Sequence, residues 1–287
     1  MKRKFFASLS MIIIFIMFFN VLVYADSNKV VSLAKDINES QRKEILKIFN
    51  VNQDEVEIIE VNNQEERKYL EGVAPEAQIG RKTMSSAYVE MLKEGSGIEV
   101  ETYNITWVTK EMYEGALITA GIKDAKIIAA APIPVSGTGA LTGILKSFEQ
   151  ATGLEIDEEK KKVATQEIVE TGELGDIIGQ DKAAELISSI KKAVIEQGIK
   201  SPEDIEKLII DIAAKLDITL TTEQINKITN LMEKISKLDI NVEEFSKQIV
   251  SLGKKIQDTL KNNQEVRSLI KRIIDAIVDF LRSIFKK

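Results

Sequence analysis

The fold of this chain is decided by residues 126–152, which read KIIAAAPIPVSGTGALTGILKSFEQAT. Lys126 to Pro132 is a short and very apolar run, which predicts a β-strand. A glycine-rich stretch follows, and Thr138 to Thr152 then has the pattern of a helix that ends at Gly153. The segment therefore predicts a strand that turns directly into a helix.

Strand and helix signals also alternate on the N-terminal side of this segment. Asn38-Glu39-Ser40-Gln41 has the form of a capping box, which opens a helix. Gly95-Ser96-Gly97 lies between two apolar runs and predicts a hairpin. In chain order we expect helix 38–49, strand 56–61, helix 65–70, strands 85–94 and 98–108, helix 109–120, strand 126–132 and helix 138–152. This interleaving predicts an α+β or α/β domain with a mixed sheet covered by helices. An all-antiparallel sheet with helices on one face is the alternative.

The pattern becomes almost entirely helical after residue 155. Ser201-Pro202-Glu203-Asp204 and Thr221-Thr222-Glu223-Gln224 open helices with capping residues. Apolar residues recur at helical spacing after both of them, and we expect about six helices in a bundle. The predicted domains are therefore a signal peptide at 1–25, an α/β domain at 26–155 and a helical bundle region at 156–287.

The first 25 residues have the order of a secretory signal peptide. A basic start at Lys2, Arg3 and Lys4 precedes the apolar run from Met11 to Phe19. Val23-Tyr24-Ala25 then places small residues where a signal peptidase cuts. We expect a protein that is secreted or held at the outer face of the cell membrane. An uncleaved anchor is the alternative to cleavage, and lipid attachment is excluded because the chain has no Cys.

Composition excludes several function classes. The chain has no His and no Cys, so it has no disulfide, no Ser-His-Asp or Cys-His site and no His-ligated zinc. The net charge is −6, and removal of residues 1–25 would leave 36 basic and 45 acidic residues, or −9. Nucleic acid is a poor partner for an acidic chain. The calcium-loop-like Asn50-x-Asn52-x-Asp54 has Glu55 where a loop glycine is needed, so we expect no metal site and no cofactor.

The most motif-like stretch is the loop between the strand and the helix. Its glycine spacing is close to that of a dinucleotide loop, but no ribose-binding acid follows and the lysine of a P-loop is absent. A tight turn packed by glycines is one interpretation, and an anion or ligand site is the other. The candidate ligand-binding residues are Ser136, Gly137, Thr138, Gly139, Thr142 and Gly143.

The C-terminal segment from Val266 to Phe285 predicts an amphipathic helix. Its apolar residues fall on one helical side, and basic residues dominate the other. Such a helix docks on an anionic membrane or a partner, or it is the last helix of the bundle. The candidate contact residues are Arg267, Lys271, Arg272, Arg282, Lys286 and Lys287.

Several further runs carry a resemblance to a known family. They are Ile79-Gly80, Thr83 to Ala87, Gly95 to Ile98, Asn104 to Thr109, Tyr113, Ala116 to Gly121, Ala131 to Gly143, Leu231-Met232 and Leu238-Asp239. The chain resembles the secreted proteins of spore-forming Gram-positive bacteria catalogued as domain of unknown function 1002. The resemblance covers nearly the whole chain after residue 25. It implies export and this domain layout, and it implies no activity and no catalytic residue.

These observations favour a non-catalytic protein of the cell envelope that binds a ligand or partner. Two alternatives stay open. One is an extracellular enzyme that uses carboxylate or Ser/Lys chemistry near residues 136–143. The other is a membrane-surface protein that acts through its C-terminal helix. The sequence names neither a ligand nor an oligomeric state.

Overall fold

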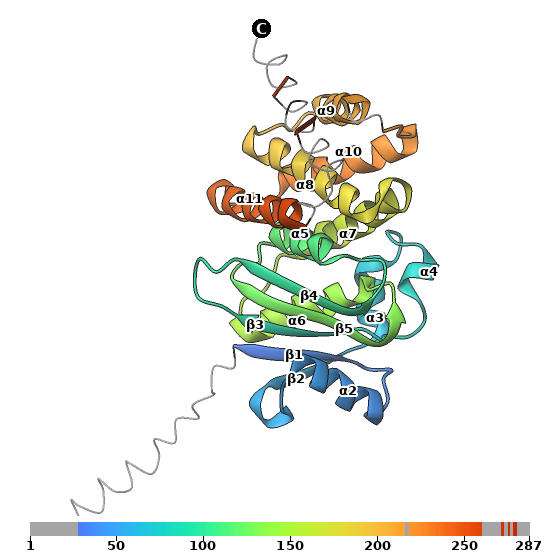
Figure 1. The fold of residues 1–287 in the computed structure, drawn as a ribbon, viewed down its shortest axis with the longest axis vertical. Helices are drawn as coiled ribbons and strands as arrows, with labels where there is room; N and C mark the ends of the chain where they lie inside the picture. Colours follow the sequence, from blue (N-terminus) through green and yellow to red (C-terminus); the bar gives the residue numbers. More distant parts are fainter. Residues whose placement is uncertain (1–27, 216–217, 260–270, 273–274, 276–277, 280–287) are drawn as a thin grey trace, which may run out of the picture.

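The computed structural model describes residues 28–215, 218–259, 271–272, 275 and 278–279. A five-stranded sheet with the order β2-β1-β3-β5-β4 lies at its centre (Figure 1). The strands are β1 (Lys29–Ala34), β2 (Glu57–Val61), β3 (Ser86–Met91), β4 (Ile98–Ile105) and β5 (Ala125–Val135). β1 pairs with β2, and β4 with β5, in parallel; β3 is antiparallel to β1 and β5. The mixed sheet is thus confirmed, and the all-antiparallel alternative is wrong.

The predicted hairpin between residues 85–94 and 98–108 is wrong. The chain does turn at Gly95 and Gly97, which have φ values of 85° and 75°. However, β5 lies between β3 and β4 and pairs with both. The physical reason is the composition of β5: its residues 127–131 are wholly buried or nearly so, and a strand this apolar is best placed inside a sheet with a partner on each side. β1, which precedes the first predicted helix, was not predicted.

Helices cover both faces of the sheet. Val31, Tyr88 and Ile128 lie in register on one face, where they pack against α2 (Glu39–Phe49). Val89 and Ile127 lie on the opposite face, under α5 (Lys110–Ala120) and α6 (Thr138–Thr152). The short helices α3 (Asn63–Leu70) and α4 (Glu76–Ile79) flank α6, and the 3-10 turn η1 (Gln53–Glu55) precedes β2. The capping box predicted at Asn38 and Gln41 is present at the start of α2.

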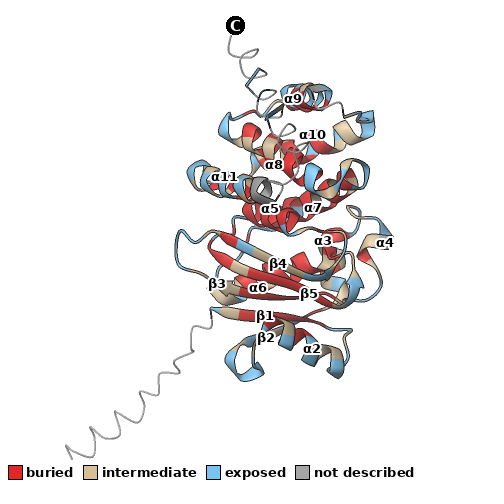
Figure 2. Cartoon of the chain, viewed as in Figure 1, coloured by how far each residue is buried: buried red, intermediate tan, exposed pale blue. Residues whose placement is uncertain are grey.

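Five further helices follow within the described residues. They are α7 (Glu158–Ile178), α8 (Gln180–Glu196), α9 (Pro202–Lys215), α10 (Thr222–Lys237) and α11 (Val242–Thr259). α7 crosses α5, so this region stacks on the helical layer that covers the sheet (Figure 1). Figure 2 shows buried residues running from the sheet through α5 into the neighbouring helices. One core cluster joins Ile127 and Leu117 to Ile168 of α7 and Phe245 of α11. The division at residues 155/156 falls between α6 and α7 and stays a prediction.

A buried ion pair joins α5, α7 and α8. Lys191 is 0% exposed, and its Nζ donates to Glu167 Oε1 (2.5 Å), to the Gly115 carbonyl (2.8 Å) and to Thr119 Oγ1 (3.0 Å). Thr119 donates its own hydroxyl hydrogen to Glu167 Oε2. A Cβ at position 115 would lie 3.1 Å from Glu167 Oε1, so glycine gives the pair its room. This cluster fixes how the two helices after residue 155 sit on α5.

Candidate functional site

The loop singled out in the sequence connects β5 to α6, as predicted. β5 ends at Val135, and α6 begins at Thr138. Gly137 is the N-cap of α6 with a φ of 97°, a left-handed conformation that favours glycine. Gly137 has no side chain with which to cap this helix start. The backbone N–H groups of its first turn are therefore not satisfied by a capping side chain.

Close packing explains the other two glycines of the loop. A Cβ at position 139 would lie 2.6 Å from Cδ of Glu66, well inside van der Waals contact. A Cβ at position 143 would lie 2.5 Å from Oγ of Ser32 on β1. Gly143 therefore serves the packing of α6 on the sheet, whereas Gly139 brings the start of α6 against a carboxyl group.

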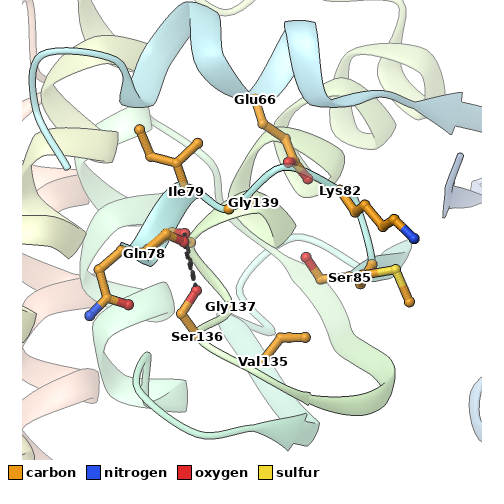
Figure 3. Close-up of a pocket in the computed structure, with 12 residues that line it drawn as sticks. Glu66, Gln78, Ile79, Lys82, Ser85, Val135, Ser136, Gly137 and Gly139 are labelled. Carbon is orange, nitrogen blue, oxygen red and sulfur yellow. Dashed lines mark hydrogen bonds between the residues drawn. The ribbon is translucent and has the colours of Figure 1, made fainter. Parts of the chain in front are cut away.

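A cavity of about 210 Å³ lies beside this loop. Its walls come from four segments: Glu66 on α3, Gln78 to Gly80 at the end of α4, the segment from Lys82 to Ser85, and Val135 to Gly139. Figure 3 shows the Glu66 carboxyl group descending from α3 towards Gly139. Four of the candidate residues from the sequence analysis line this cavity: Ser136, Gly137, Thr138 and Gly139.

The structure does not bring the other two candidates to the cavity. Thr142 lines a separate hollow of about 260 Å³ between α3, α6 and the start of α7. That hollow is closed by ion pairs, among them Lys146 with Glu65 and Lys161 with Glu149 and Glu158. These charged groups are paired with one another, and the pairs connect α3, α6 and α7. Gly143 faces β1, as described above.

The loop hydroxyls are held by a backbone carbonyl. Ser136 Oγ donates to the Gln78 carbonyl at 2.9 Å, and Thr138 Oγ1 donates to the same oxygen at 2.8 Å. Figure 3 shows the first of these bonds. Each hydroxyl has one hydrogen to donate, so both have used it. Their remaining hydrogen-bonding capacity is as acceptors.

Glu66 is the ionisable group at the centre of the site. Its side chain is 2% exposed, and its Oε2 accepts a hydrogen bond from Asn63 Nδ2 at 3.2 Å. Burial raises the pKa of Glu66 to about 7, because removal from water disfavours the charged form. The side chains of Thr83 and Asn63 oppose this rise in pKa as hydrogen-bond donors, and the negative charges of Asp36 and Glu65 add to it. Glu66 therefore changes its charge near neutral pH.

The sequence analysis missed Glu66 as a site residue. One signal was available, since Glu66 lies four positions before Leu70 and shares the buried face of α3 with it. That signal was weak, because Leu70 is the one apolar residue of α3 that is buried on this face. The cavity wall formed by Gln78 had no comparable signal, because it is a backbone carbonyl.

The C-terminal candidates fall largely outside the described residues. Arg267, Arg282, Lys286 and Lys287 lie there, as does the predicted signal peptide at 1–25. Lys271 and Arg272 are described and have helical backbone. The membrane or partner contact proposed for this segment stays a prediction. Among the helices that the structure describes, none combines the length and the apolar character that crossing a bilayer requires.

Metal binding has no support in the described part of the chain. There the structure contains no group of three or more acidic residues close enough to hold an ion, and the sequence has no His or Cys. The cavity beside Gly139 has one carboxyl group. Hard divalent cations usually take six or more oxygen ligands, so a single carboxyl is a poor start for such a site.

Comparisons with known proteins place the chain in a family. The chain is 41% identical over 261 residues to "Uncharacterized protein YpuA" of Bacillus subtilis (strain 168), a match that covers 90% of this chain and 89% of that protein. No solved structure matches the chain. A family model described as "Protein of unknown function (DUF1002)" matches residues 33–252. The resemblance seen in the sequence is thereby confirmed, and the chain belongs to this family of proteins of unknown function.

Proposed function

We propose that this protein acts outside the cytoplasm as a non-catalytic binding protein for a small polar molecule. The observation that carries the proposal is the inward-facing carboxyl group of Glu66 on the cavity beside Gly139. A cavity with a few convergent polar groups and an ionisable group of shifted pKa is the usual form of a small-molecule site. Export rests on the leader-like order of residues 1–25.

The geometry supports binding better than catalysis. A serine nucleophile needs a base within hydrogen-bond reach. In the part of the chain that the structure describes, neither Ser85 nor Ser136 hydrogen-bonds to Glu66, and Ser136 donates to the Gln78 carbonyl instead. The amino group of Lys82 points outward, away from Ser136 (Figure 3). Lys82, Ser85 and Ser136 therefore line one cavity, but they do not form the hydrogen-bonded pair of nucleophile and base that a Ser/Lys enzyme needs.

The test is thermal unfolding of residues 26–287 against a panel of small molecules. The panel holds amines, amino acids, sugars, phosphates, cell-wall fragments and Ca²⁺. A molecule that binds the folded state raises the midpoint of unfolding by mass action. We expect one class to stabilise the wild type, and we expect Gly139→Ala to remove the effect because a methyl group there displaces the Glu66 carboxyl.

The matched control is Gly253→Ala. Gly253 lies in α11, and a Cβ there would meet nothing within 4 Å. The control variant should keep the full ligand-induced shift. If no compound in the panel shifts the midpoint of the wild type, the binding function is rejected. Hydrolysis or transfer of a panel compound by the wild type would favour the enzyme alternative.

A further inference from the structure

The side chains of Glu66, Ser136 and Thr138 line the cavity with oxygens that can accept hydrogen bonds. The hydroxyl groups of Ser136 and Thr138 both donate their hydrogen to the Gln78 carbonyl, so towards a bound molecule they can act only as hydrogen-bond acceptors. Glu66 adds two carboxyl oxygens, which Asn63 and Thr83 serve as side-chain donors. Among the described residues that line the cavity, the charged donor is Lys82, which is exposed and whose amino group points away from these oxygens. A molecule that binds to these three side-chain oxygens must therefore bring its own donors.

The charge of Glu66 points to the same kind of molecule. A buried carboxylate is costly unless a cation pairs with it. Among the described residues Glu66 has no ion-pair partner, whereas its neighbour Glu65 is paired with Lys146. A bound cation would supply the missing countercharge.

We propose that the cavity binds the ammonium group of a small organic amine, with the Glu66 carboxylate as its counter-ion. This inference rests on the binding function proposed above and names its ligand class. An ammonium group has three N–H donors, and Glu66, Ser136 and Thr138 provide three acceptors that line the same cavity. The volume of about 210 Å³ is below the range of about 300–1,000 Å³ that is typical of drug-sized ligands, so the amine is small.

The same features disfavour an anion. The start of α6 is the part of the loop that would attract one, through its N–H groups and helix dipole. The Glu66 carboxyl already lies against Gly139 at this helix start, and its charge repels a second anion. The phosphate-binding interpretation of the glycine-rich loop is therefore weaker than the amine-binding one.

The inference predicts that binding releases protons. The groups that face Glu66 are Asn63 and Glu65 on its own helix, Asp36 after β1, and Thr83, which follows Lys82. The two acids favour the protonated form, and the remaining cation points outward. Since the pKa of Glu66 is about 7, about half of the molecules carry its proton at pH 7, and an ammonium ion must displace it. We expect affinity to rise about 30-fold between pH 5.5 and pH 8.5 through this linkage.

The experiment is isothermal titration calorimetry on residues 26–287 with methylammonium, glycine, acetate and potassium chloride. Each titration is run at pH 5.5, 7 and 8.5, in two buffers with different ionisation enthalpies, so that released protons are counted. We expect the two ammonium compounds to bind, acetate and K⁺ not to bind, and about half a proton to be released at pH 7.

Two variants locate the binding. Glu66→Gln keeps the shape and removes the charge, and we expect it to lower amine affinity at least tenfold and to abolish proton release. Glu71→Gln removes an exposed carboxylate from the end of the same helix and should behave as the wild type. Gly139→Ala is the second variant, used if Glu66→Gln fails to give the wild-type circular dichroism spectrum.

The outcomes separate this inference from the proposed function. Amine binding that survives Glu66→Gln, or amine binding without pH dependence, overturns the inference. Binding of acetate or K⁺ in place of amines, lost in Gly139→Ala, overturns the ligand class and leaves the binding function standing. If neither these probes nor the wider panel bind, both proposals fall.

Discussion

Lys191→Met tests whether the buried ion pair sets the stability of the whole fold. Lys191 is fully buried, and its ammonium group reaches Glu167, Thr119 and the Gly115 carbonyl. Methionine has an unbranched side chain of similar length, so it fills most of the same space and leaves little cavity. The main cost is the Glu167 carboxylate, which is 3% exposed and loses its cation.

The expected loss of stability is about 3–5 kcal/mol, the usual cost of removing one partner from a buried pair. The double variant Glu167→Met, Lys191→Met removes both charges at once. The Thr119 hydroxyl can then donate its hydrogen to the Gly115 carbonyl, which lies 3.3 Å away, instead of to Glu167. We expect the double variant to recover most of the loss, because replacing a whole buried pair by apolar groups is often close to neutral.

The assay is unfolding of residues 26–287 by urea, followed by circular dichroism, for the wild type, both single variants and the double variant. A thermal scan should show a drop of about 10 °C for Lys191→Met, since domains of 150–250 residues lose about 2–4 °C per kcal/mol. A loss below about 1 kcal/mol for Lys191→Met would refute the reasoning. So would a double variant as unstable as the sum of the two singles, because uncoupled residues simply add.

Three further predictions concern the cavity and the single tryptophan. The stability of Glu66→Gln relative to the wild type should rise between pH 5 and pH 8. The pKa of Glu66 in the folded protein, about 7, lies above the 4.5 of a free glutamate, so the wild type loses up to about 3 kcal/mol of stability across this window. A constant difference between the two proteins across the unfolding series would contradict this. Gly139→Ala should lower the free energy of unfolding by about 1–3 kcal/mol through overpacking, whereas Gly253→Ala should be neutral or slightly stabilising. If the two variants unfold at the same urea concentration, position 139 has room for a methyl group. Gly172→Ala should displace the ring of Trp107 that lies over it and change the fluorescence emission of this sole tryptophan, and an unchanged spectrum would rule out that contact.

Local signals predicted most of the helices and the central strand. The box at Asn38 and Gln41 and the box at Thr221 and Gln224 both appear with the expected side-chain bonds. Residues 138–152 form a helix with the predicted ends. These features depend on residues that are close in sequence, and capping and apolar periodicity report them directly.

The misses concern pairings between distant parts of the chain. The turn at residues 95–97 exists, but no local pattern could reveal that β5 would enter between the two strands that it separates. Lys191 and Glu167 lie on different helices, and each taken alone resembles a solvated helix residue. Of the candidate site, the loop from Ser136 to Gly139 was identified, whereas Glu66 reached it only through the packing of α3 on α6.

The opposite placement of α2 and α5 has a consequence for the handedness of the chain. β1–α2–β2 and β4–α5–β5 each join parallel neighbours, and both step across the sheet in the same direction. All four strands point the same way, yet the two connecting helices lie on opposite faces. The two crossovers therefore have opposite hands, although such connections are right-handed in about 98% of cases. Two copies of one β–α–β unit would share a hand, so the two halves of this sheet are not related by an internal duplication.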